Sequence, residues 1–153
     1  MRALTTAFGI TLCAALAVPP ASAQEAEVRA AITESLSAWT SGDVEGFGRF
    51  FTADARGFNL DGGVLIQGYN AVALRAALAA GFAFTVRPSN IDVKVYGDAA
   101  VASAYLVGSI TLPGGATQEG TWRYTETRVR QDGTWKIVQY HVSPYTAQTG
   151  GRR

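Results

Sequence analysis

The chain has 153 residues, of which 48% are hydrophobic and 16% charged, with a formal net charge of +1, one Cys and one His. This length predicts one domain with a sizeable core, and the composition argues against intrinsic disorder. The balanced charge argues against a nucleic-acid-binding surface, and one Cys with one His cannot build a zinc site or a disulfide framework.

The N-terminus has the pattern of a secretory signal peptide. Arg2 precedes a short apolar run at residues 7–18, and two prolines separate that run from an A-x-A cleavage pattern at residues 21–23. The run is too short to span a bilayer. Cys13 lacks the small residue expected just before a lipoprotein cysteine, so no membrane anchor is expected.

Cleavage near Ala23 would divide the chain into three parts: a signal peptide (1–23), one domain (24–145) and a flexible polar tail (146–153). The domain and tail together carry no Cys and equal numbers of acidic and basic residues. The signal-peptide pattern predicts a periplasmic or secreted protein. An exported domain without Cys does not depend on oxidative folding.

The first half of this domain shows helical patterns. An apolar stripe at spacings of four, four and three predicts an amphipathic helix over residues 25–40; its members are Val28, Ile32, Leu36 and Trp39. Asp43 is placed to cap a second, shorter helix, which is expected to contain Phe47, Phe50 and Phe51.

A hairpin and a third helix are expected next. Two short runs, residues 55–60 and 64–67, flank a Gly-rich turn and predict a pair of strands. Asn70 can cap a helix over residues 71–80, which is rich in Ala and Leu and is followed by Gly81.

After Gly81 the hydrophobic pattern changes to the period of two that is typical of strands. Five strands are expected, at residues 82–87, 91–96, 99–112, 121–130 and 134–144. The pair Asp132-Gly133 is the strongest hairpin signal in the chain. Helices first and a strand meander afterwards predict an α+β fold, with the helices packed on one face of a mostly antiparallel sheet.

Three segments carry a resemblance to a known superfamily: WTSGD at residues 39–43, FTADA at 51–55 and ETRVRQDGTWKIVQYHVS at 126–143. The chain resembles the nuclear-transport-factor-2-like superfamily, and its last segment is similar to SnoaL-like proteins and to the related association domain of calcium/calmodulin-dependent protein kinase II. The resemblance implies a cone of three helices on a strongly curved sheet, with a pocket on the concave face and a homodimer through the outer sheet face. Such folds host enzymes and non-catalytic domains alike.

Strand alternation assigns candidate residues to faces of the sheet. We expect one set to face the pocket; its members are Trp122, Tyr124, Glu126 and Arg128. In the final strand, alternation groups Tyr140 with Lys136, Val138 and Val142, and groups His141 with Trp135, Ile137, Gln139 and Ser143 on the other face.

Arg128 is the leading candidate for ligand binding, because the resemblance places the matching Arg in the pocket and a guanidinium can bind a carboxylate bidentately. The alternative is that Arg128 pairs with Glu126, two residues away on the same face. The kinase domain's pocket has further arginines where this chain has Leu106 and Val142. Their absence favours a small apolar or weakly acidic ligand.

Three residues are weak candidates for catalysis. His141 could act as a general base, but its predicted position opposite the pocket favours a structural or interface role. Asp54 is placed to act as a turn or cap residue at the start of a strand. Glu126 would be weakened as a base by Arg128. No complete acid–base pair is evident.

Aromatic residues are expected to line or floor the cone, and at its mouth Tyr69 and Tyr124 could orient an apolar ligand; the wider set also includes Trp39, Phe51, Phe58, Phe82, Phe84, Trp122 and Tyr140. Two functions remain open. The first is a ligand-binding or homo-oligomerising domain, and the second is an isomerase, lyase or cyclase that uses a pocket carboxylate for proton transfer. Neither requires a cofactor or a metal.

Overall fold

The computed structural model describes residues 20–60 and 63–146 of the chain. The predicted signal peptide falls outside these residues up to position 19, and the predicted tail falls outside them from position 147. The first described helix, α1 (Ala21–Ser41), starts four residues before the predicted helix and includes the predicted cleavage pattern in its first turn.

Two further helices follow, and both begin at the capping residues expected from the sequence. Asp43 precedes α2 (Val44–Gly48), and its carboxylate accepts a hydrogen bond from the Gly46 amide at 2.8 Å. Asn70 precedes α3 (Ala71–Ala79), and its Oδ1 accepts from the Ala73 amide at 2.9 Å. Each side chain satisfies an amide that the first helical turn leaves without a backbone partner.

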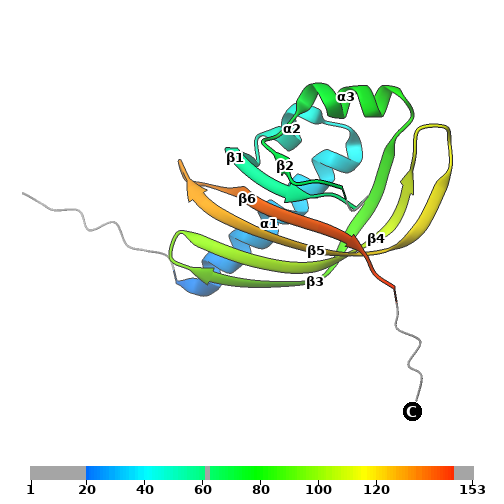
Figure 1. Cartoon of the computed structure of the whole chain (residues 1–153). Coiled ribbons are helices and arrows are strands. Elements are labelled where there is room, and N and C mark those ends of the chain that lie inside the picture. The colour runs from blue at the N-terminus through cyan, green and yellow to red at the C-terminus, as the bar shows by residue number, and fades with distance from the viewer. Residues whose placement is uncertain (1–19, 61–62, 147–153) are drawn as a thin grey trace, which may run out of the picture.

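Six strands within the described residues form one sheet in the order β2-β1-β6-β5-β4-β3. Their bounds are β1 (Phe51–Phe58), β2 (Ile66–Gln67), β3 (Ala83–Tyr96), β4 (Ala99–Thr111), β5 (Thr117–Gln131) and β6 (Thr134–Pro144). All neighbouring pairs are antiparallel except β1 and β6, which are parallel. Figure 1 shows the curved sheet with the helices on its concave side, so the predicted α+β cone is confirmed.

The turn between β5 and β6 confirms the strongest hairpin signal. Asp132 and Gly133 both have positive φ, 51° and 75°. Two successive residues of this kind match the right-handed twist of the flanking strands, and Gly has no Cβ to oppose the conformation.

The prediction of two separate strands at residues 82–87 and 91–96 is wrong, because β3 runs through both. Pro88 lacks an amide hydrogen but pairs with Leu106 of β4, which is possible because β3 is the edge strand of the sheet. A register shift follows between Ser89 and Asp92, and Asn90 takes a positive φ of 53° there. The strand therefore bends at a bulge instead of ending.

Two expectations about side-chain placement also need correction. Phe51 was expected in the second helix but opens β1, where it pairs with Ile137 of β6. In β6 the simple alternation fails, since Thr127 pairs with Gln139 while Arg128 pairs with Ile137. The extra residue, Val138, is a bulge that changes the parity of the strand. Trp135 and Ile137 are therefore buried like Val142, although alternation had placed them on the face opposite Val142.

The hydrophobic core lies between α1 and the concave face of β3 to β6. The predicted stripe of α1 supplies Val28, Ile32 and Leu36, all of which are buried. The even-numbered residues of β4 and β5 face them, including Leu106, Trp122 and Tyr124. This core fills one end of the cone. At the other end, under α2 and α3, side chains line a space that they do not fill.

Candidate functional site

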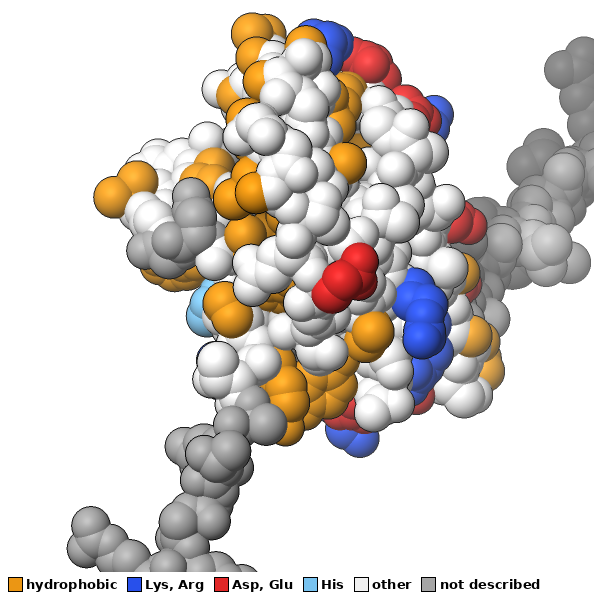
Figure 2. Space-filling view, turned by 90° about the vertical axis from the view of Figure 1, so that its right-hand side faces the viewer, with side chains coloured by type: hydrophobic (Ala, Val, Ile, Leu, Met, Phe, Trp, Pro, Cys, Tyr) orange, Lys and Arg blue, Asp and Glu red, His pale blue; other side chains and the backbone are white. Residues whose placement is uncertain are grey.

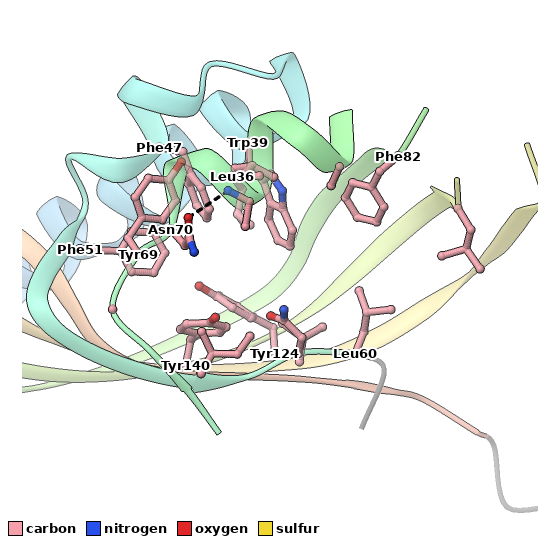
Figure 3. Close-up of a pocket in the computed structure, with 18 residues that line it drawn as sticks. Leu36, Trp39, Phe47, Phe51, Leu60, Tyr69, Asn70, Phe82, Tyr124 and Tyr140 are labelled. Carbon is pink, nitrogen blue, oxygen red and sulfur yellow. Dashed lines mark hydrogen bonds between the residues drawn. The ribbon is translucent and has the colours of Figure 1, made fainter. Parts of the chain in front are cut away.

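A cavity of about 460 Å³ lies between the sheet and the helices. Figure 3 shows Trp39, Leu36 and Phe47 on its helix side and Tyr124 and Tyr140 on its sheet side. The wall is largely apolar, and its remaining lining residues are Phe51, Asn59, Leu60, Ile66, Gly68, Tyr69, Asn70, Ala73, Leu74, Ala77, Phe82, Leu112 and Val142.

Aromatic contacts hold the wall in shape. The Trp39 ring stacks between Phe84 and Phe47, with centroid distances of 3.7 and 5.2 Å. Phe51 stacks on Tyr69 at 5.1 Å and meets Tyr140 edge-on at 5.9 Å. Stacked and edge-on pairs of this kind stabilise a fixed arrangement of rings, so the wall is preorganised before any ligand arrives.

Helix α3 covers the cavity without packing into the core. None of its residues is buried, yet Ala73, Leu74 and Ala77 line the cavity. An ion pair between Arg75 and Glu45 joins α3 to α2. The helix is therefore placed to contact a bound molecule instead of filling the space itself.

At the sheet side of the cavity, a chain of polar contacts runs from Tyr124 into the interior. The Tyr124 hydroxyl donates to Oε2 of Glu126. Arg128 donates from Nε to Oε1 of Glu126 at 2.5 Å and from Nη2 to Oε2 at 3.2 Å. Tyr124 lines the cavity, whereas Glu126 and Arg128 do not. The ion pair is thus a second layer behind the tyrosine.

The Arg128 guanidinium makes further contacts in the protein interior, besides its hydrogen bonds to Glu126. Its Nη2 donates to Ser35 Oγ at 2.8 Å, and its Nη1 donates to the Trp135 carbonyl at 3.0 Å. The Phe50 ring lies 5.7 Å from the guanidinium carbon. Arg128 and Glu126 have fully buried side chains. The structure shows the pairing of Arg128 with Glu126 that the sequence offered as the alternative, and the guanidinium does not line the cavity.

Three cavity tyrosines have raised pKa values. Burial raises the pKa of Tyr124 well above its usual value, and the charge of Glu126 raises it further while that of Arg128 lowers it. Burial also raises the pKa of Tyr140, and burial followed by the charge of Asp43 raises that of Tyr69. All three hydroxyls therefore keep their protons at neutral pH.

The hydroxyls differ in their partners. The Tyr69 hydroxyl donates to the Val44 carbonyl at 2.5 Å, and that of Tyr124 donates to Glu126. The Tyr140 hydroxyl has no hydrogen-bond partner among residues 20–60 and 63–146. The buried Trp39 Nε1 is also without a partner in this part of the chain.

The other candidates from the sequence lie away from the cavity. Trp122 is buried in the core and does not line the cavity. Asp54 is exposed on β1. His141 is exposed on the outer face of the sheet, as its predicted position required, with its ring 5.9 Å from Phe58. Of the predicted ligand-binding residues, Trp39, Tyr69, Tyr124 and Tyr140 line the cavity together.

Sequence reasoning missed the contribution of α3 and of Asn59, Leu60 and Ile66 to the cavity wall. The spacing of Ala73, Leu74 and Ala77 places them on one helix face, which was a usable signal. No local pattern marked Ser35 as the partner of Arg128, because the two residues are 93 positions apart.

Neither a metal site nor a membrane span emerges from the part of the chain that the structure describes. No three His, Cys, Asp or Glu side chains within residues 20–60 and 63–146 are arranged to hold a metal ion. None of the helices there is both long and apolar enough to cross a bilayer.

The chain was compared with protein families and with curated proteins. The SnoaL-like domain model matches residues 28–147. No curated protein matches the chain.

Several solved structures share the fold. A putative dehydratase of the NTF2-like family from Streptomyces avermitilis is 24% identical, with 82% of this chain and 99% of that chain covered and a TM-score of 0.67. A ketosteroid isomerase-like protein from Erwinia carotovora atroseptica is 17% identical, with 80% and 97% covered and a TM-score of 0.68. An NTF2-like protein from Cytophaga hutchinsonii is 22% identical, with 80% and 98% covered and a TM-score of 0.66.

At these identities the structural neighbours show the fold alone. The link to the kinase association domain stays a prediction. The family model covers most of the chain, and the neighbours share its cone of helices and curved sheet. The chain therefore belongs to the SnoaL-like family and has the fold of the NTF2-like structures.

Proposed function

We propose that this protein binds a small, largely apolar molecule in the cavity between the sheet and the helices. The observation that carries the proposal is an unfilled aromatic cavity of about 460 Å³, a volume within the range of small-molecule sites. Apolar surface that is left unfilled forgoes packing energy, so its retention beside a well-packed core favours a role in binding.

The cavity wall favours binding over proton-transfer catalysis. A general base must lie within hydrogen-bond reach of the proton that it removes. None of the cavity-lining residues in the described part of the chain is an Asp, Glu or His. The nearest carboxylate in the polar chain, Glu126, lies behind Tyr124 and is paired with Arg128. Arg128 thus supports the wall from behind and is not proposed as a ligand anchor.

A titration with naphthalene and 2-naphthol, followed by calorimetry and by tryptophan fluorescence, tests the proposal. Trp39 lines the cavity, whereas Trp122 and Trp135 are buried in the core, so a bound ring should change the emission of Trp39. We expect saturable binding of at least one probe with a change in fluorescence.

A matched pair of α3 variants locates the binding. Ala77→Phe places a ring in the cavity, whereas Ala76→Phe places the same ring on the exposed side of the same helix. We expect Ala77→Phe to abolish binding and Ala76→Phe to retain it. Absence of binding by wild type, or equal binding by both variants, would overturn the proposal.

Export is part of the proposal, and it rests on the signal-peptide pattern of residues 1–23. Expression of the full chain in a bacterium, followed by fractionation and mass spectrometry, tests it. We expect a periplasmic or secreted species that begins at Gln24. A cytoplasmic species of full length would contradict export.

A homodimer through the outer sheet face is also proposed. Hydrophobic side chains are exposed on this face, among them Val101 and Tyr105, and Tyr105 meets Tyr145 edge-on at 5.6 Å. Figure 2 views the molecule from the end that lies on the right of Figure 1, where hydrophobic side chains are exposed as well. Light scattering after size exclusion should give the mass of two chains, and Val101→Glu should halve it. A monomeric wild type would contradict the dimer.

A further inference from the structure

The Tyr124 hydroxyl can only accept a hydrogen bond from a ligand. Arg128 holds Glu126 through two parallel hydrogen bonds, Nε to Oε1 and Nη2 to Oε2, which is the geometry of an ionised carboxylate. An ionised carboxylate has no proton to donate, so Tyr124 must be the donor in its contact with Glu126. Its single proton is thereby directed away from the cavity, and its lone pairs remain for a ligand.

Tyr140 provides the complementary hydroxyl. Tyr140 pairs with Glu126 across β5 and β6 and lines the cavity beside Tyr124 (Figure 3). Its hydroxyl has no hydrogen-bond partner among the described residues, so its proton is available to a ligand. The sheet side of the cavity therefore offers a ligand one hydrogen-bond acceptor, the Tyr124 hydroxyl, and one hydrogen-bond donor, the Tyr140 hydroxyl.

We propose that the cavity selects molecules whose polar group is a hydroxyl, that is, alcohols or phenols. The ligand's hydroxyl donates a hydrogen bond to Tyr124 and accepts one from Tyr140. The inference rests on the proposed function and names the chemical class of its ligand. A hydroxyl group both donates and accepts, whereas a ketone or an ether only accepts. A ketone or an ether would leave the acceptor lone pairs of the buried Tyr124 hydroxyl unsatisfied, and that loss lowers affinity.

Charged ligands are disfavoured by the same wall. A carboxylate would offer no donor to Tyr124, and an ammonium group would lose its hydration in a cavity whose described lining has no carboxylate. A neutral hydroxyl group on the ligand can form hydrogen bonds with both tyrosines, and no charge has to be moved from water into the cavity.

Four probes of one ring system test the inference by calorimetry on the wild-type protein: 2-naphthol, 2-methoxynaphthalene, 2-acetonaphthone and naphthalene. We expect 2-naphthol to bind roughly three- to tenfold more tightly than the ether and the ketone, which is the effect of one net hydrogen bond. The ratio of these affinities in the wild-type protein tests the inference even if a variant fails to fold.

Two variants assign the preference to its residue. Tyr124→Phe removes the acceptor, so 2-naphthol should lose its advantage over the ether and the ketone. Tyr140→Phe is the matched control: it removes the donor, so all three oxygen-bearing probes should weaken while 2-naphthol keeps its advantage.

The outcomes separate the two proposals. Wild-type binding of the ether or the ketone as tight as that of 2-naphthol would overturn the hydroxyl preference and leave the binding function standing. An unchanged preference in folded Tyr124→Phe would overturn the role of Tyr124. Failure of all four probes to bind would overturn the proposed function itself.

Discussion

Replacement of Arg128 by Met is the sharpest test of the buried polar chain. The guanidinium is fully buried, and it donates to Glu126, to Ser35 and to the Trp135 carbonyl. Met has a similar length but no charge, so the variant leaves the Glu126 carboxylate buried without its counterion. Removal of one partner from a buried ion pair reduces the free energy of unfolding by about 3–5 kcal/mol.

That loss is large beside a typical domain stability of about 5–15 kcal/mol, so urea denaturation followed by circular dichroism at pH 7 will detect it. The control is Arg75→Met, which breaks an ion pair whose side chains are 53% and 68% exposed. Exposed pairs contribute about 0–1 kcal/mol, and the control should lose no more than that.

A second variant separates the loss of charge balance from the loss of packing. Glu126→Leu combined with Arg128→Met removes both charges, and apolar replacement of a buried ion pair is often neutral or stabilising. The double variant should therefore be more stable than Arg128→Met alone. A loss below about 1 kcal/mol in Arg128→Met, or a double variant no more stable than the single one, would refute this reasoning.

Three further predictions concern the cavity wall. Gly57→Ala should lower the free energy of unfolding by about 1–3 kcal/mol in urea denaturation, because a Cβ on Gly57 would overlap the Tyr140 ring; unchanged stability would show that the ring can move aside. Raising the pH above about 10 should destabilise the fold: an unfolded chain releases the Tyr124 proton near that pH, whereas burial raises the pKa in the folded state, so stability falls as pH rises toward the folded-state value. Urea denaturation between pH 9 and 11, run in parallel on Tyr124→Phe, checks this, and an equally steep fall in the variant would contradict it. Asn70→Ala removes the cap of α3 and should destabilise that helix by about 1 kcal/mol, measured as faster amide exchange in α3 with little change in α1; protection equal to wild type would show that the cap is dispensable.

Local structure was largely readable from the sequence, because its causes are local. Asp43 and Asn70 cap helices where their side chains can reach the first free amides, and Asp132-Gly133 forms a turn that requires positive φ. Alternation placed Tyr124, Glu126 and Arg128 on one face of β5, since residues two apart in a strand share a face.

Bulges are where this reasoning failed. The sequence marked neither the continuation of β3 through Pro88 nor the extra residue at Val138. Both depend on pairing with neighbouring strands: Pro88 is tolerated because β3 is at the edge of the sheet, and Val138 is displaced because β6 pairs with β5 out of simple register.

The fold class, the N-terminal caps of α2 and α3, the main hairpin and the face on which each residue of β5 lies were predictable from local patterns. The depth of each residue along that face depends on contacts between segments that are distant in the chain. Arg128 lies where α1 and Phe50 close over the sheet, whereas Tyr124 lies where the space under α3 stays open. The physical reason is that alternation sets the direction of a side chain, while the curvature of the sheet and the placement of distant helices set what that side chain meets.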